Sequence, residues 1–305
     1  MSKKPICPKK GKTHTLAPLS KGSSPTPFNL GPFQNALTTE SYPRTIDNID
    51  ALDCDDPLCV AEYVEDMYKH FREKEAVTPP TYMAAQPQIN ESFRAILIDW
   101  LASVTFSFKF EKDTLYLAVD IIDRFLTKKK VRKSELQLVG AAAFFVASKY
   151  EEVYPMYLEK LCYICDDVYN EDDFLYMETK ILKTLNYQVT VPTGNTFLPR
   201  FLKAAHANEE VSNIANYILI ESLQNYNLLE YYPSELAAAS VMIARDTVGR
   251  PAWSHTLCKY TGYKSEEVEV IANAVLLERA NMPDSLLAIK KQYNYVSNVE
   301  FKQEI

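Results

Sequence analysis

One stretch decides the fold: Ser134-Glu135-Leu136-Gln137-Leu138-Val139-Gly140-Ala141-Ala142-Ala143-Phe144-Phe145-Val146-Ala147-Ser148-Lys149-Tyr150-Glu151-Glu152. It has the length of a helix and is apolar all round between Leu136 and Ala147. A helix with no polar face must be surrounded by protein or by lipid, and about twelve apolar residues fall short of the roughly 20 that cross a bilayer. We therefore expect the central helix of a helical bundle. Its charged end, from Lys149 to Glu152, is expected to lie on the surface and to contact a partner.

The sequence contains a second copy of this helix. Ser234-Glu235-Leu236 repeats Ser134-Glu135-Leu136 after 100 residues, and small apolar residues again follow, at 237–244. Such self-similarity predicts a duplicated bundle. The first copy ends in Lys149, whereas the matching position of the second is Gly249. Any binding chemistry is therefore expected in the first bundle.

Composition favours an all-α protein. The chain has 305 residues, which is enough for two domains, and it combines only 7 glycines with no strong alternating pattern. The six cysteines show no even framework and no signal peptide precedes them, so we expect a reduced, intracellular protein. No segment is long and apolar enough to predict a membrane span. The cysteines stand at positions 7, 54, 59, 162, 165 and 258.

Charge is unevenly distributed along the chain. Residues 1–44 carry seven Lys or Arg and a single acid, a net charge of +6, so the total of −7 leaves −13 on the remainder. Nucleic-acid binding depends on neutralising phosphates, so this acidic part is not expected to bind nucleic acid. The basic tail is read either as a nuclear-import signal, as a weak nucleic-acid arm or as a solvated charged segment.

The chain divides into four parts. Residues 1–55 are expected to be a disordered basic tail, because apolar periodicity is missing there. Residues 56–190 hold a leading helix and the first bundle, 191–295 the second bundle, and 296–305 a C-terminal tail. Asp56-Pro57 is typical of a helix start, and this helix should run to about Glu75. One of its faces is formed by Val60, Tyr63, Val64, Met67 and Phe71. Further helices are expected at 112–127, 157–165, 170–185, 195–206, 209–230, 233–247, 254–261, 265–279 and 283–293.

Charged residues interrupt the apolar surroundings of the first bundle. Arg94 lies in a helix whose residues 93, 96, 97, 100 and 101 form an apolar stripe. A buried arginine needs a carboxylate partner, because an unpaired buried charge is very costly. Asp123, inside the apolar face of the next helix, is one candidate partner.

Enzymatic features are scarce. There is no glycine-rich phosphate loop, and the four histidines are scattered. Cys162-x-x-Cys165 has a metal-like or redox spacing, but in a helix rich in Tyr and Leu it is read as two packed core cysteines. We expect no catalytic residue, no metal and no cofactor.

Several ordered motifs resemble those of cyclins. They include Phe93-Arg94-Ala95-Ile96-Leu97-Ile98-Asp99-Trp100-Leu101, Ile122-Asp123-Arg124-Phe125-Leu126 and Ala147-Ser148-Lys149-Tyr150-Glu151-Glu152. Glu62-Tyr63-Val64-Glu65-Asp66 is similar to the leading helix of B-type mitotic cyclins. The resemblance covers about residues 55–290. It implies two tandem cyclin boxes, each of five helices, behind a leading helix, in a protein that binds and activates a cyclin-dependent kinase and does no chemistry itself.

The resemblance also implies roles for individual residues. Arg94 and Asp123 would form the structural ion pair of the first box, which Leu138 helps to define. Lys149 would bind carbonyl groups near the regulatory helix of the kinase, and Glu178 would orient it. The remaining kinase contacts are expected from Tyr150, Leu182, Tyr187, Tyr63 and Met67.

A substrate-docking groove is the third expectation from the family. In related cyclins it binds Arg-x-Leu motifs, and the matching positions are Phe93, Ile96, Leu97, Trp100, Leu136 and Gln137. Phe93 replaces the usual Met, and Ser103 stands where a groove acid often sits, so the strength of docking stays open.

The family also implies a destruction signal, Arg-x-x-Leu, in the N-terminal tail. Arg44-Thr45-Ile46-Asp47 has Asp in place of that Leu, so regulated degradation cannot be predicted.

These observations predict a B-type cyclin that controls the G2/M transition from the nucleus and cytoplasm. The alternatives are an A-type or transcription-linked cyclin, or a nucleic-acid-associated cyclin-box factor. The acidic folded part and the absence of paired Cys-x-x-Cys motifs oppose the last of these.

Overall fold

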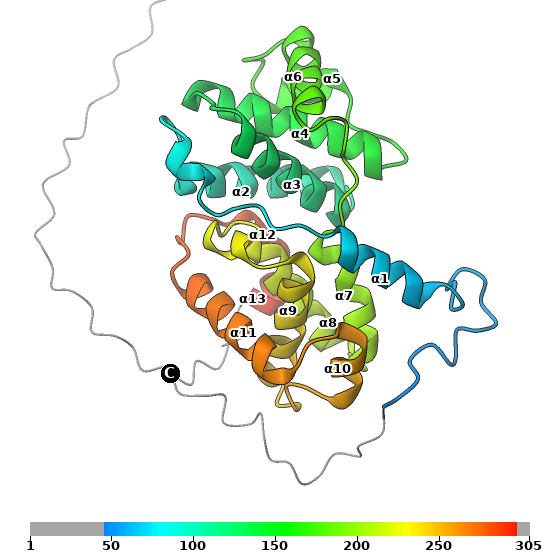
Figure 1. Ribbon diagram of the computed structural model, residues 1–305. Coiled ribbons are helices and arrows are strands. Elements are labelled where there is room, and N and C mark those ends of the chain that lie inside the picture. The colour runs from blue at the N-terminus through cyan, green and yellow to red at the C-terminus, as the bar shows by residue number, and fades with distance from the viewer. Residues whose placement is uncertain (1–45, 298–305) are drawn as a thin grey trace, which may run out of the picture. The chain divides into compact units, whose positions relative to one another are not determined.

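The computed structural model describes residues 46–297, and every regular element in that range is helical (Figure 1). None of these helices is long and apolar enough to cross a membrane. The first bundle consists of α2 (Glu91–Phe108), α3 (Lys112–Lys128), α4 (Leu136–Glu151), α5 (Leu158–Ile164) and α6 (Glu171–Thr184). The second consists of α7 (Gly194–Ala204), α8 (Glu209–Ser222), α9 (Pro233–Thr247), α10 (His255–Thr261) and α11 (Ser265–Ala280). The remaining elements precede, connect or follow the two bundles: α1 (Val64–Lys74), η1 (Tyr82–Ala85), η2 (Lys133–Glu135), η3 (Asn227–Glu230), α12 (Ala288–Gln292) and α13 (Asn294–Ser297).

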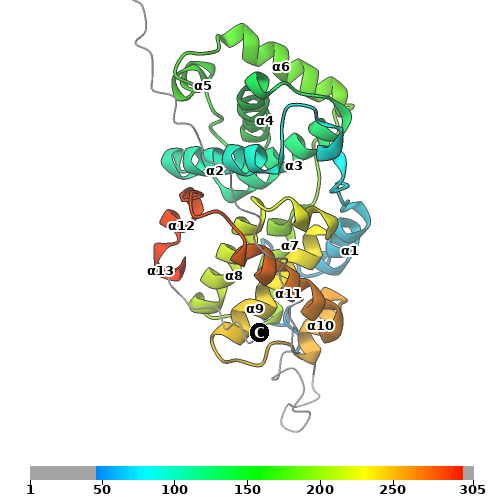
Figure 2. The same ribbon diagram turned by 90° about the vertical axis from the view of Figure 1, so that its left-hand side faces the viewer.

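Helix α4 is the centre of the first bundle, as the sequence predicts. Every residue from Leu138 to Ser148 is buried, and α2, α3 and α6 pack around the helix (Figure 2). The small residues let these neighbours approach closely. A Cβ atom added to Gly140 would lie 2.6 Å from Leu97 Cδ1, so any larger residue would force the Leu97 side chain to shift.

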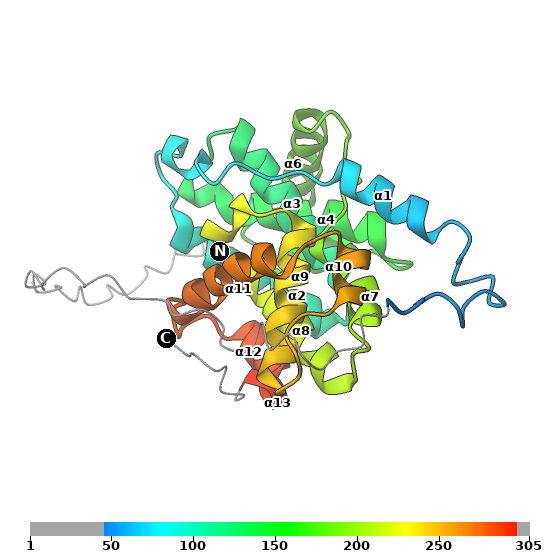
Figure 3. The same cartoon turned by 60° about the horizontal axis from the view of Figure 1, so that its bottom comes forward.

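Helix α9 repeats this arrangement in the second bundle. It is packed by α7, α8 and α11, and Figure 3 shows α12 and α13 beside α8. Both central helices begin in the same way. The Glu235 carboxylate accepts from Tyr232 N at 2.7 Å, and the Glu135 carboxylate accepts from Arg132 N at 3.4 Å. The duplication seen in the sequence is therefore structural.

The first described residues, 46–55, correct the prediction of a disordered tail that reaches residue 55. Asp50 forms a bidentate ion pair with Arg200, with distances of 3.1 and 2.9 Å, and also pairs with Lys203. Ile49 is buried. Order here comes from charge pairing with α7, which a search for apolar periodicity does not detect. The remainder of that tail, residues 1–45, lies outside the described range, as do residues 298–305 of the C-terminal tail.

The leading helix is shorter than predicted. It begins at Val64 instead of Asp56, because Asp56 Oδ1 accepts from Leu58 N in a local turn and Val60 has a left-handed φ of 50°. The inward face also differs, since Tyr68 rather than Met67 accompanies Phe71 against Phe197 of α7. Arg72 and Glu75 fasten the end of α1 to Ser234 at the start of α9.

Two boundaries in the second bundle also differ from the prediction. The helix expected over 209–230 ends at Ser222, because the next residues turn to contact α2: Leu223 O accepts from Arg94, and Gln224 donates to Asp99. The single helix expected over 283–293 is instead α12 and α13, separated at Tyr293.

Candidate functional site

Lys149 lies at the exposed end of α4, where the buried helix emerges. Its ammonium group forms an ion pair with Glu178 of α6 and lies 3.9 Å from the centroid of the Phe145 ring. The lysine side chain is 38% exposed and that of Glu178 is 14% exposed. A carboxylate and a ring therefore fix a lysine that still faces solvent. The second bundle has no equivalent, because α9 ends at Thr247 and Gly249 occupies a left-handed turn.

Exposed aromatic residues follow this lysine in the sequence. Tyr150 follows it directly and its hydroxyl lies 2.5 Å from Thr190 Oγ1, which ties the end of α4 to the segment after α6. Tyr150 is 51% exposed and Tyr154 78% exposed. Large apolar side chains left in solvent mark interaction surfaces when they gather near one another. Sequence reasoning named Tyr150 but gave no role to Tyr154.

The chain after α6 presents Tyr187 through an unusual backbone. Asn186 and Tyr187 both have left-handed φ angles, 53° and 60°, and Tyr187 N donates to Leu182 O at 2.8 Å. A left-handed conformation costs a residue such as tyrosine roughly 1–2 kcal/mol, and backbone strain of this kind concentrates at functional sites. The turn leaves the Tyr187 side chain exposed while Leu182 packs partly against the core.

Glu152 secures the same end of α4 to the start of α3. Its carboxylate accepts from Glu111 N at 2.8 Å and from Thr114 Oγ1 at 2.5 Å. A carboxylate at a helix N-terminus satisfies free N–H groups and is favoured by the helix dipole. Sequence reasoning missed this cap, because nothing in the spacing of residues 111 and 152 indicates that they meet.

Arg94 and Asp123 form a buried, bidentate ion pair with both distances at 2.7 Å. Tyr82 donates a third hydrogen bond to Asp123, and Arg94 Nη1 reaches Leu223 O of the second bundle. Burial disfavours the charged guanidinium, but the charge and hydrogen bonds of Asp123 raise the pKa of Arg94 above its ordinary value. The pair therefore orders the first bundle and connects it to the second.

The predicted docking residues do not all lie at the surface. Ile96 is exposed and Phe93, Trp100 and Gln137 are partly exposed, but Leu97 and Leu136 are buried. Leu97 turns inward because Gly140 leaves room for it. The two leucines are therefore part of the core beneath this surface and cannot contact a docked peptide directly. We call the exposed side chain of Ile96 and the partly exposed side chains of Phe93 and Trp100 the α2 face.

Tyr63 and Met67 project from the outer side of the leading segment and are exposed. Side chains of α1 contact the second bundle. Tyr68 OH donates to Thr196 O at 3.2 Å, and Arg72 donates to Ser234 Oγ at 2.7 Å. Tyr63 and Met67 are thus held on a helix that is anchored independently of Lys149.

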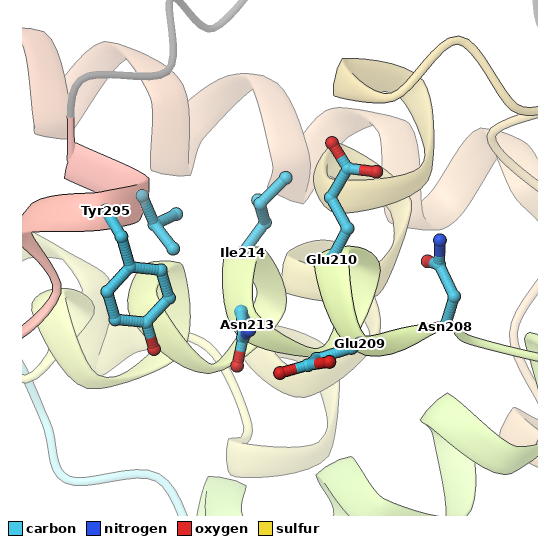
Figure 4. A pocket seen from close by; sticks show the side chains of 7 residues that line it. Asn208, Glu209, Glu210, Asn213, Ile214 and Tyr295 are labelled. Atoms are coloured by element: carbon cyan, nitrogen blue, oxygen red, sulfur yellow. The ribbon is translucent and has the colours of Figure 1, made fainter.

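A pocket of about 460 Å³ lies elsewhere, between the start of α8 and the segment around Tyr295 (Figure 4). Asn208, Glu209, Glu210 and Asn213 line its polar side, and Ile214, Tyr295 and Val296 line the apolar side. None of the predicted site residues contributes to this pocket.

Within residues 46–297 no group of three potential metal ligands occurs. Cys162 and Cys165, at the end of α5, are both free thiols. Burial raises the pKa of the Cys165 thiol to about 11.

Two family models match the chain. The N-terminal domain of cyclins matches residues 66–190, and the C-terminal domain of cyclins matches residues 192–303. The chain therefore belongs to the cyclin family.

Cyclin-B1-2 of Arabidopsis thaliana is 41% identical over 259 residues, which cover 84% of this chain and 58% of the relative. G2/mitotic-specific cyclin-1 of Antirrhinum majus is 40% identical over 268 residues, with 87% and 56% covered. The chain thus spans only 56 to 58% of the length of these relatives.

Solved structures share the fold. A viral cyclin from herpesvirus saimiri superposes with a TM-score of 0.54 at 23% identity, covering 72% of this chain and 93% of that chain. A chain of the yeast RNA polymerase II CTD kinase complex CTDK-1 also gives a TM-score of 0.54, at 13% identity, with 70% and 79% covered. At these identities the likeness establishes the architecture of two tandem helical domains.

Proposed function

We propose that this chain is a non-catalytic regulatory subunit that binds and activates a cyclin-dependent serine/threonine kinase. The observation that carries the proposal is the fixed, solvent-facing Lys149 among exposed tyrosines at the end of a buried helix. A protein surface of this kind offers an ammonium group for backbone carbonyls and apolar rings for the contact around them. Glu178, Tyr150, Leu182 and Tyr187 complete the proposed kinase surface, and Tyr63 and Met67 add a second area of contact.

Activation is proposed to work through the conformation of the kinase. A partner that binds the inward position of the regulatory helix more tightly shifts the population toward it. That position allows the Lys–Glu ion pair of the kinase to form and the phosphates of ATP to be held correctly. The rigid end of α4 suits this role, because Glu178, Phe145 and the Glu152 cap hold it in place before a partner arrives.

The names of the relatives support a role at the G2/M transition. We further propose that the α2 face helps to recruit substrates or inhibitors that bear Arg-x-Leu motifs. Neither nucleic acid nor membrane is proposed as a partner, since the chain outside its basic tail is strongly acidic. Nuclear and cytoplasmic location stays a proposal, which imaging of a fluorescent fusion tests.

The test is reconstitution with purified cyclin-dependent kinase subunits. We expect the full chain to form a stable heterodimer with at least one of them and to raise phosphorylation of a short peptide well above the rate of the kinase alone. Mass spectrometry of the kinase that copurifies from cells identifies the subunit to use. A well-folded chain that activates none of these kinases contradicts the proposal.

A further inference from the structure

The α2 face lies beside an exposed basic loop. Lys129, Lys130, Arg132 and Lys133 are all solvent-exposed, and they connect α3 to η2. Lys133 Nζ lies 4.2 Å from the centroid of the Phe93 ring. The positive charge of this loop therefore begins directly at one end of the apolar α2 face.

A buried glutamine holds this loop in place. Gln86 is 7% exposed, and its amide nitrogen donates to Leu126 O and Lys129 O, both at 2.7 Å. Its amide oxygen accepts from Val131 N at 3.0 Å. Because every one of these bonds is to the backbone, the path of the loop is fixed while its lysine side chains stay free. Such preorganisation lowers the entropic cost of binding a partner.

Two carboxylates near the α2 face, Asp99 and Glu135, are engaged elsewhere. Asp99 accepts from Gln224 and from the backbone of Leu287 and Ala288. Glu135 pairs with Arg132 at 2.8 Å, which neutralises that arginine. Lys129, Lys130 and Lys133 form no ion pair within residues 46–297. Three positive charges without an ion pair thus lie in a loop that begins beside the apolar α2 face.

We propose that the α2 face selects peptide segments in which an apolar anchor is flanked by acidic side chains. The anchor would lie on Phe93, Ile96 and Trp100, and aspartate or glutamate beyond it would face Lys133, Lys129 and Lys130. Complementary charge supplies specificity and faster association more than raw affinity. This inference rests on the proposed docking role of the α2 face and names its substrate class. It predicts that acidic side chains flanking the apolar anchor strengthen docking.

The test uses three fluorescein-labelled 12-residue peptides that share one central leucine as the apolar anchor. Their flanks are Asp/Glu-rich, Ser/Gly-rich or Lys/Arg-rich, and binding to the full chain is followed by anisotropy at 50 and 300 mM salt. We expect the acidic peptide to bind about 10-fold more tightly than the neutral one at low salt, as a few exposed charge pairs allow. Most of that preference should disappear at 300 mM salt, where screening is strong.

Matched variants separate the loop from general charge. Replacing Lys129, Lys130 and Lys133 by Gln should abolish the preference for acidic flanks. Replacing Lys69, Lys259 and Lys264 by Gln, all exposed elsewhere on the chain, changes the net charge equally and should preserve this preference. Equal binding of all three peptides, tighter binding of the basic peptide, or no binding of any peptide overturns the inference. Kinase activation, measured on a short substrate without flanking motifs, reports separately on the proposed function.

Discussion

Lys149 and Glu178 form an ion pair that joins the exposed end of α4 to the middle of α6. The pair lies where a fully buried helix reaches solvent, so the lysine has little freedom to move away. Glu178 is the more buried partner, which suits a residue that orients the lysine rather than one that meets a partner first. The pair therefore links the packing of the first box to the surface proposed to bind a kinase.

Replacing Glu178 with Gln should weaken kinase binding moderately. The amide keeps the shape of the side chain but removes the charge that orients Lys149, and a loss of about 1 kcal/mol corresponds to roughly five-fold in affinity. Titration calorimetry with the kinase measures this change. Glu159→Gln, at an exposed position of α5, is the matched control. If both variants bind the kinase with the affinity of the native chain, Glu178 does not orient Lys149 for binding.

Breaking the Arg94–Asp123 pair should destabilise the fold strongly. Arg94→Met leaves the Asp123 carboxylate buried without its cation, and a buried charge stripped of its partner typically costs about 3–5 kcal/mol. Urea unfolding followed by circular dichroism measures the loss. Arg132→Met, which breaks an exposed pair with Glu135, should cost less than about 1 kcal/mol. Adding Asp123→Leu to Arg94→Met should recover much of the stability, and further loss in the double variant contradicts this account.

The contact of residues 46–55 with the second box should weaken in acid. Burial alone would raise the pKa of Asp50, but hydrogen bonds and charges from Arg200 and Lys203 outweigh it, so the pKa lies below its ordinary value of 3.8. A carboxyl group with a lowered pKa contributes stability above its unfolded-state pKa, and that contribution is lost as the pH falls through the folded-state value. The contact should therefore persist from neutral pH down to about pH 4 and release below it.

Limited proteolysis between Asp47 and Asp53 measures this release. An acid-active protease should cut this segment faster as the pH falls below that point. Asp50→Asn should be cut readily at every pH, because the amide cannot pair with Arg200 in the same way. The exposed Asp55→Asn serves as a control. Identical protection of Asp50→Asn and the native chain at pH 6 contradicts the assignment.

Gly140→Ala tests the close approach of α2 and α4. Alanine favours a helix by about 1 kcal/mol over glycine, but the new Cβ would lie 2.6 Å from Leu97 Cδ1, and overpacking costs typically 1–3 kcal/mol. We expect a net loss of about 1 kcal/mol in urea unfolding. Leu97→Val in the Gly140→Ala background should recover part of it by removing the clash. A net gain in stability for Gly140→Ala alone shows that the contact is not tight.

Much of this fold follows from local sequence patterns. Helix α9 has the predicted bounds, because Pro233 and Glu235 mark its start and an apolar run fills its length. The start of α1 could not be predicted in the same way. Asp56-Pro57 carries a helix-start pattern, yet the backbone turns at Val60 before the helix begins. The order of residues 46–55 depends on Asp50 meeting Arg200, a contact 150 residues away that no local pattern reveals.

In the candidate site, too, some features follow from the local sequence and others depend on contacts between distant residues. The position of Lys149 at the end of a buried helix follows from the sequence, and the structure places Glu178 beside it. The apolar stripe of α2 was harder to interpret, because spacing alone does not separate a buried leucine from an exposed isoleucine. Only the packing of Leu97 against Gly140 shows which side chains remain at the surface.

The most direct test of the central claim is kinase activation by Lys149→Ala. Loss of a hydrogen-bonded charge that becomes buried in a complex should cost roughly 2–5 kcal/mol of binding, or about 30-fold or more in affinity. Lys160→Ala, which removes an exposed lysine from α5, is the matched control. With both variants folded to the same extent, the account predicts that Lys149→Ala requires at least 30-fold more protein for half-maximal kinase activity and that Lys160→Ala requires no more than the native chain. Full activation by Lys149→Ala at the native concentration would contradict it.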